Sequence, residues 1–236
     1  AAWHRDMEQR RPSPLMPDDS VDLNGFLSMQ RGGAVVPLGP GTWSLLQTVD
    51  AAPVPKTVGY WEGEIVLDAC GLAVMEARWS AVGPRAAEAL IEITRNETVV
   101  RGLRLNLDYR AGYTGPVVYV HDCNDVVLDD LTILHAPVAI WLERVNRVSL
   151  RNIRVRDLNS TGIYMRTATH VVVSGCQVAE SILGAANEVD MNATDSECCL
   201  AGNDFGATGI IAGASLGANN RPVLGDTSFN VCGAVT

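Results

Sequence analysis

A short repeat constrains the fold of this chain more than any other feature of its sequence. Four segments share the pattern apolar, polar, turn-former, apolar, polar, apolar: residues 100–105, 128–133, 150–155 and 173–178. Their starts lie 28, 22 and 23 residues apart. A repeat of this period, rich in β-branched residues and without helical periodicity between its strands, is typical of a solenoid with one coil per repeat. The sequence therefore predicts a parallel β-helix.

The length of the chain fits one such solenoid. A short apolar strand follows each of the first three repeats, at residues 117–120, 139–142 and 162–165. Coils stack at about 4.8 Å, so about eight coils of ~25 residues would form a rod about 40 Å long. The chain has 236 residues and is 47% hydrophobic, enough for a sizeable core without a second domain. We expect an all-β, single-stranded parallel β-helix.

Composition excludes several classes of partner. The net charge is −9 and no Lys/Arg-rich run occurs, which argues against nucleic acid. No run of 18 apolar residues exists, so we expect no membrane insertion. The six cysteines include no C-x-x-C pair and have no histidines at zinc spacing, and we expect no disulfide framework, no metal and no cofactor. Cys176 takes the repeat position of Leu103, Leu131 and Ile153, which predicts a core residue.

The two ends of the chain differ from the repeats. Residues 1–31 are expected to form an N-terminal arm and cap, because Pro12, Pro14 and Pro17 favour an extended segment without strand or core character. A short amphipathic helix after Asp19 or Ser20 would then cover the first coil. The β-helix is assigned to residues 32–215, and residues 216–236 to a C-terminal cap or tail. The N-terminus shows no apolar segment of a signal peptide, so targeting does not indicate a compartment.

The segment that opens the repeats resembles a known family. A double glycine at Gly32-Gly33, a strand, and then Pro40-Gly41-Thr42-Trp43 is similar to the opening of the pectin-lyase-like superfamily of right-handed β-helices. Polysaccharide lyases, glycosidases and phage tailspikes share that opening, so the resemblance implies a right-handed architecture rather than one activity. The Asn-Thr-Asp, His-Gly and Arg-Ile-Lys motifs of polygalacturonases are absent. Asp129-Asp130 lies at the turn position of the repeat and is expected to form a turn.

Side-chain alternation predicts which residues face outward together. Tyr119, Trp141 and Tyr164 form an outward aromatic column, one residue per coil. Glu92 precedes this column and Asp190 follows it, with Glu188 just before Asp190. A second outward column holds His121, Glu143 and Arg166.

These columns suit a saccharide, because sugar rings stack on aromatic faces while charged groups bind hydroxyls. The residues predicted to bind substrate are Tyr119, Trp141, Tyr164, His121, Arg166, Glu92 and Glu188. Glu143 and Asp190 are the candidate catalytic pair, because two coils separate them by about 9.6 Å, close to the roughly 6.5–9.5 Å of an inverting glycosidase. A subunit interface or an incidental surface would also explain this face.

The favoured function is that of a tailspike-like virion protein that contacts host surface polysaccharide, with cleavage of that polysaccharide left open. The reasons are the short solenoid, the opening motif without its enzymes' signatures, and a proline-rich arm able to attach to a larger virion particle. A homotrimer is expected by resemblance to tailspikes, with a virion or extracellular location. The alternatives are a secreted polysaccharide glycosidase or lyase of the same fold, and a purely structural virion protein.

Overall fold

The computed structural model describes most of the repeat region and isolated segments on either side of it. The described residues are 14–17, 23–28, 34–45, 47–51, 65–78, 86–178, 187–190, 199–201, 203, 211–212 and 221–222. Nearly all of them are β-structure, with one short α-helix and one 3-10 turn. Within this part of the chain, no helix is long and apolar enough to cross a membrane.

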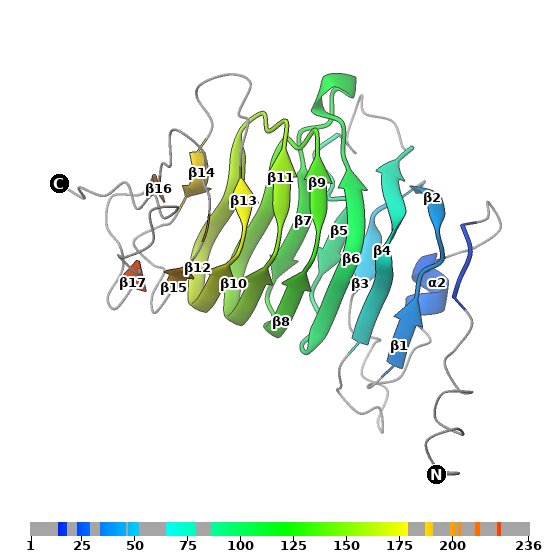
Figure 1. Cartoon of the computed structure of the whole chain (residues 1–236), viewed down its shortest axis with the longest axis horizontal. Coiled ribbons are helices and arrows are strands. Elements are labelled where there is room, and N and C mark those ends of the chain that lie inside the picture. Colours follow the sequence, from blue (N-terminus) through cyan, green and yellow to red (C-terminus); the bar gives the residue numbers. More distant parts are fainter. Residues whose placement is uncertain are drawn as a thin grey trace, which may run out of the picture.

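Every strand pairs in parallel within one continuous ladder. In chain order the elements are α2 (Leu23–Ser28), β1 (Ala34–Pro37), β2 (Gly41–Leu45), β3 (Val49–Ala51), β4 (Ile65–Ala77), β5 (Ile91–Ile93), β6 (Thr98–Asn106), η1 (Tyr109–Ala111), β7 (Pro116–His121), β8 (Asn124–Asp129), β9 (Thr132–Leu134), β10 (Val138–Arg151), β11 (Arg154–Arg156), β12 (Thr161–Ser174), β13 (Gln177–Val178), β14 (Asn187–Asp190), β15 (Cys199–Ala201), β16 (Ile211–Ala212) and β17 (Arg221–Pro222). Figure 1 shows strands of successive coils side by side along the long axis, for example β9, β11 and β13.

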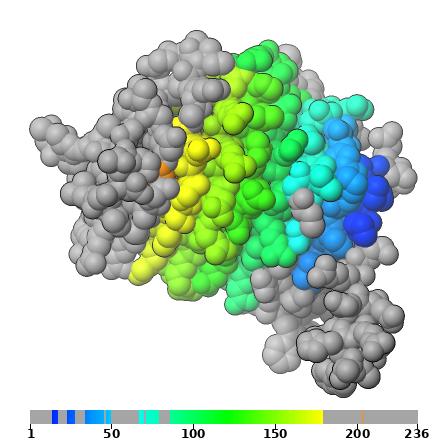
Figure 2. All heavy atoms as spheres, viewed as in Figure 1, coloured from blue at the N-terminus to red at the C-terminus, as the bar shows by residue number. Residues whose placement is uncertain are grey.

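The register of the ladder confirms the alignment of the four repeats. Val100 pairs with Leu128, Leu128 with Leu150, and Leu150 with Val173. The same column begins earlier, where Leu67 pairs with Val100. Each coil therefore lies directly on the preceding one, as a parallel β-solenoid requires. Figure 2 shows the strands as successive bands of side chains across the body.

The inward side chains form one apolar core along the solenoid. Leu103, Leu131, Ile153 and Cys176 occupy equivalent positions, and each is at most 1% exposed, which confirms Cys176 as a core residue. Burial raises the pKa of the Cys176 thiol to about 11 and that of the Cys123 thiol to about 12. Both thiols therefore act as small apolar groups rather than nucleophiles.

Residues in the left-handed region make the corners between strands. Gly102, Asp130, Asn152 and Gly175 are equivalent in the four repeats and have φ of 70°, 51°, 53° and 62°. Glycine adopts this conformation without steric cost, and Asp and Asn tolerate it better than most residues. Asp130 is thus a turn residue, as its position in the repeat predicts.

The N-terminal segment differs in part from its expected form. The short helix predicted after the prolines is present as α2, while its candidate caps Asp19 and Ser20 lie outside the described residues. Leu15, expected to belong to an arm without strand character, forms a parallel bridge with Leu38. Its amide donates to Pro37 O at 2.8 Å, and its carbonyl accepts from Gly39 N at 2.6 Å. Because an edge strand leaves such groups unpaired, this segment covers the edge of the first coil.

The parallel ladder also reaches into the segment predicted as a C-terminal cap or tail. In β17, Arg221 pairs with Cys199 and Pro222 with Leu200 of β15. Pairing therefore continues past residue 215, the predicted end of the β-helix. The chain beyond Pro222 lies outside the described residues.

Candidate functional site

The predicted aromatic column is present on the outer face of β7, β10 and β12. Tyr119 pairs with Trp141, and Trp141 with Tyr164, so the three rings lie one coil apart. Their centroids are 5.7 Å apart between Tyr119 and Trp141 and 4.8 Å apart between Trp141 and Tyr164, with edge-to-face geometry. Each of the three side chains is half-buried. The column forms a continuous aromatic surface that runs across the strands, along the solenoid axis.

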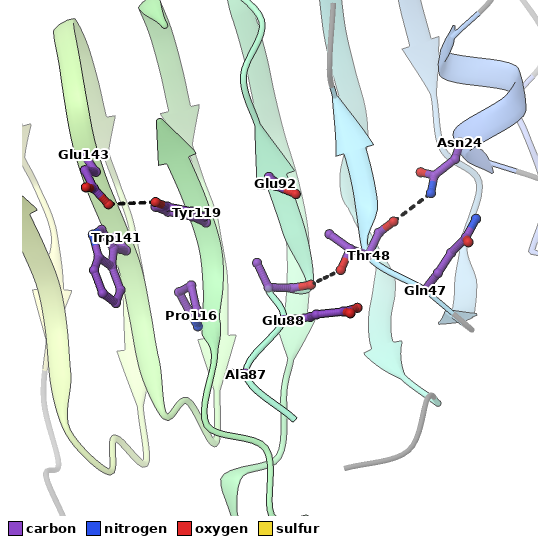
Figure 3. A pocket seen from close by; sticks show the side chains of 11 residues that line it. Asn24, Gln47, Thr48, Ala87, Glu88, Glu92, Pro116, Tyr119, Trp141 and Glu143 are labelled. Atoms are coloured by element: carbon purple, nitrogen blue, oxygen red, sulfur yellow. Dashed lines mark hydrogen bonds between the residues drawn. The ribbon is translucent and has the colours of Figure 1, made fainter. Parts of the chain in front are cut away.

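One end of this column opens into a groove with a volume of about 670 Å³. The groove is lined by Asn24, Gln47, Thr48, Ala87, Glu88, Ala89, Glu92, Pro116, Tyr119, Trp141 and Glu143. Figure 3 shows these side chains in a row that crosses neighbouring strands from α2 to β10. Because β3, β5, β7 and β10 pair in succession, the row spans three strand spacings, or about 14 Å.

Glu143 is held at the wall of the groove by two partners. Its Oε2 accepts a hydrogen bond from the Tyr119 hydroxyl at 2.7 Å, and its Oε1 pairs with the guanidinium of Arg144. The hydrogen bond from Tyr119 is the main cause that lowers the pKa of Glu143, and Arg144 lowers it further. Glu143 is therefore ionised at neutral pH, in the form that accepts hydrogen bonds or a proton.

His121 lies between two carboxylates on the same face. Its Nε2 is 2.7 Å from Glu92 Oε1, and its Nδ1 is 2.8 Å from Asp122 Oδ2. The ring also stacks on Tyr119 with centroids 4.3 Å apart. Burial by itself lowers the pKa of His121, but the hydrogen bonds to Asp122 and Glu92 outweigh it and raise the pKa above its ordinary value. The protonated ring donates to both carboxylates at once.

Asp122 connects His121 to Arg144 and closes a network of six side chains. Arg144 Nε donates to Asp122 Oδ1 at 2.6 Å, and Nη2 donates to Oδ2 at 2.8 Å. This bidentate pair is the main cause that lowers the pKa of Asp122. The six-residue network consists of Glu92, His121, Asp122, Arg144, Glu143 and Tyr119. It joins three successive coils and fixes the orientation of two carboxylates that line the groove.

The structure brings together only part of the predicted site. Tyr119, Trp141, Glu92 and Glu143 line the groove, and His121 contacts Glu92. Tyr164 extends the aromatic column beyond the groove lining. Arg166 pairs in register with Glu143, but its side chain is exposed and it does not line the groove.

The backbone register locates Asp190, the candidate catalytic partner of Glu143. Asp190 in β14 pairs with Tyr164, which pairs with Trp141, so Asp190 lies two coils beyond Glu143. Glu188 precedes Asp190 in the same strand. The side chains of Glu188 and Asp190 lie outside the described part of the structure. The roles of Glu143 and Asp190 as a catalytic pair stay predictions.

Sequence reasoning missed the end of the groove nearest α2. Asn24 Nδ2 donates to Thr48 O at 2.7 Å, and Thr48 Oγ1 donates to Ala89 O at 2.7 Å. These residues lie outside the regular repeats, so no periodic signal marks them. Asp122 and Arg144 were also missed, although their opposite charges at equivalent positions of successive coils are a readable signal.

Glu92 and Asp122 are each hydrogen-bonded to His121. Among the residues that the structure describes, no group of three or more His, Cys, Asp or Glu side chains is placed to hold a metal ion. The side chains that line the groove offer aromatic stacking, hydrogen bonding and proton transfer.

Comparisons with known proteins identify the fold. No family model matches the chain, and no curated protein matches it. A glycosyl-hydrolase-like structure from Parabacteroides merdae superposes with a TM-score of 0.59 and 14% identity over 82% of this chain and 93% of its own. The surface adhesin PfbA of Streptococcus pneumoniae gives 0.59 and 9% over 84% of this chain and 57% of its own. ORF18 of Geobacillus virus E2 gives 0.51 and 9% over 80% and 47%. At these identities the similarity establishes a shared fold.

Proposed function

We propose that this chain is a polysaccharide-binding β-solenoid and that the groove beside Trp141 is its binding site. The observation that carries the proposal is the aromatic column of Tyr119, Trp141 and Tyr164, which continues into a groove with a polar lining. Aromatic faces stack on the apolar faces of sugar rings, while ionised carboxylates accept hydrogen bonds from hydroxyls. Because the column crosses the strands, a bound polysaccharide lies along the solenoid axis.

Within this function we favour a tailspike-like virion protein that contacts host surface polysaccharide. The opening motif and the proline-rich segment before the first coil support it. The similarity in fold to a viral protein and to a surface adhesin is compatible with it. In this proposal the chain forms a homotrimer, the arm attaches it to a larger virion particle, and it acts in the virion or outside the cell.

Three measurements on the full chain separate this proposal from its alternatives. They are size in solution by light scattering, binding to a glycan array, and release of reducing ends from each glycan bound. A trimer that binds glycan without releasing ends is the expected result. Release of ends by a trimer would mean that the tailspike-like protein also cleaves its glycan, whereas release by a monomer would identify a secreted glycosidase or lyase. A trimer that binds no glycan would leave a structural virion protein.

Hydrolysis is a second candidate function, because Glu92 and Glu143 line the same groove. They lie in β5 and β10, two coils apart, which places their backbones about 9.6 Å apart along the axis. This distance is close to the roughly 6.5–9.5 Å of an inverting glycosidase. Asp190 lies two coils from Glu143 on the opposite side, so each of the two carboxylates is a candidate partner.

Amide variants distinguish the two partners. Glu143→Gln should abolish any release of reducing ends and spare most of the glycan binding, because the amide keeps the shape and loses the charge. Either Glu92→Gln or Asp190→Asn should have the same effect, which would identify the partner. Retention of full cleavage by Glu143→Gln would rule out this mechanism.

A further inference from the structure

The charged side chains that line the groove are all acidic. Glu88, Glu92 and Glu143 line it, and the described lining contains no Lys or Arg. The polar remainder is neutral, with Asn24, Gln47 and Thr48 at the end nearest α2. A ligand in this groove therefore meets carboxylates at Glu88, Glu92 and Glu143 and neutral polar groups near α2.

Two cations of the described part of the chain lie next to the groove, His121 and Arg144, and both are engaged by carboxylates. His121 has one ring nitrogen at Glu92 and the other at Asp122. Arg144 donates from Nε and Nη2 to Asp122 and from Nη1 to Glu143. Each of these cations already pairs with two carboxylates. The lining itself therefore carries three carboxylates and, among the described residues, no cationic side chain.

We propose that this groove selects glycans whose sugar units carry no acidic group and discriminates against uronate and sulfated polysaccharides. The inference rests on the proposed function, because it concerns the ligand of the same groove. A neutral glycan donates its hydroxyls to the carboxylate oxygens of the lining. An acidic unit at the same place meets like charges in a partly enclosed space, where water screens them less than at an open surface.

The charges outside the groove reinforce this selection. The whole chain carries a net charge of −9, so its long-range field also opposes a polyanion. The exposed Arg166 is in register with Glu143 on the next coil, and it lies outside the lining. Discrimination should therefore be strongest at low salt and weaken as salt screens the charges.

A direct test measures binding of the full chain to glycan probes that differ in charge. The probes are a panel of neutral hexasaccharides and two acidic ones, oligogalacturonate and sulfated carrageenan fragments. We expect at least one neutral hexasaccharide to bind at least tenfold more tightly than either acidic probe in 20 mM salt. The ratio should shrink in 0.5 M salt.

Two charge variants test whether the lining causes the preference. Glu88→Gln should narrow the ratio of neutral to acidic affinity at least threefold, because it removes one carboxylate from the groove. Asp130→Asn is the matched control, since it removes the same charge at a corner outside the lining. It should change the ratio less than Glu88→Gln does.

The outcomes separate failure of this inference from failure of the proposed function. Acidic probes that bind as tightly as neutral ones, or more tightly, would overturn the charge selection and leave the polysaccharide site standing. Equal effects of Glu88→Gln and Asp130→Asn would show that the net charge of the chain, rather than the groove, discriminates. A chain that binds no probe of either class would overturn both proposals.

Discussion

The hydroxyl of Tyr119 donates a hydrogen bond of 2.7 Å to Glu143 Oε2, although the two residues lie 24 positions apart in the sequence. Burial, followed by the bond to Glu143, raises the pKa of Tyr119 to about 12, so the hydroxyl stays a donor throughout the neutral range. The same bond keeps Glu143 ionised. The aromatic column and the acidic lining of the groove are therefore one connected unit.

Replacement of Trp141 tests whether this face is a glycan groove. Trp141→Ala should weaken oligosaccharide binding by about 1–3 kcal/mol and leave the oligomer intact, because it removes a large aromatic stacking surface. If the face is instead a subunit interface, the same change should break the oligomer. Calorimetry and light scattering measure the two effects.

Val172→Ala is the control for the Trp141 variant. Val172 is exposed, at 42%, and does not line the groove, so its truncation should change neither binding nor size. A Trp141→Ala protein with unchanged affinity and unchanged size would eliminate both interpretations of this face.

Removal of the Tyr119 hydroxyl should shift the titration of Glu143. Tyr119→Phe deletes the main cause of its lowered pKa, so the pKa of Glu143 should rise, which carboxyl NMR can follow. A carboxylate whose pKa is lower in the folded than in the unfolded protein stabilises the fold at pH above its unfolded-state pKa. This stabilisation is lost as the pH falls through the folded-state pKa. The variant should therefore show a smaller loss of stability on acidification.

Tyr109→Phe provides a matched control for this titration. The hydroxyl of Tyr109 donates to Asp157 Oδ1 at 2.8 Å, away from the groove. Its removal should leave the titration of Glu143 unchanged. An unchanged pKa of Glu143 in Tyr119→Phe would mean that the neighbouring arginines, rather than Tyr119, keep Glu143 ionised.

His121 should make the stability of the fold depend on pH near neutrality. The pKa of His121 is raised in the folded state. Its contribution to the free energy of unfolding is therefore fully present below pH about 6.5, the ordinary pKa of histidine. This contribution is lost as the pH rises through the pKa of the folded state. The difference in free energy of unfolding between wild type and His121→Gln should therefore shrink from pH 5.5 to pH 9. Urea titrations across this range measure it. A difference that grows with pH would contradict the assigned network.

Two core substitutions test the register of the coils. Ile153 has no exposed surface, so Ile153→Asp should prevent cooperative folding by burying an unpaired charge. Cys176→Val should cost less than roughly 1.5 kcal/mol, since it keeps an apolar side chain of similar size. Circular dichroism and thermal melting measure both. A soluble, cooperatively melting Ile153→Asp protein would show that the register is wrong.

Two truncations locate the boundary of the N-terminal arm. Deletion of residues 1–13 should leave the free energy of unfolding unchanged, because the contacts of Leu15 with the first coil remain. Deletion of residues 1–17 removes two backbone hydrogen bonds, to Pro37 and from Gly39, and should lower it by about 1–3 kcal/mol. Urea unfolding of the pair measures the difference. Equal stabilities would show that this bridge does not hold the first coil.

The sequence alone determined the columns of the solenoid. Parallel strands stack residue on residue, and side chains alternate with a period of two, so a repeat that aligns by pattern also aligns in space. This is why the stacking of Val100 on Leu128, the burial of Cys176 and the turn at Asp130 follow from the repeat. The order of the outward aromatic residues is fixed by the same periodicity.

Only the tertiary structure decided which outward side chains meet. The contact between Glu92 and His121 depends on rotamers and on the left-handed corner at Asp122, which no sequence period specifies. The end of the groove at Asn24 and Thr48 comes from irregular segments that reach it through the packing of α2 on β3. Backbone pairing between coils follows the period of the repeat and can be read from the residues, whereas contacts between irregular segments depend on loop paths set by the assembled core.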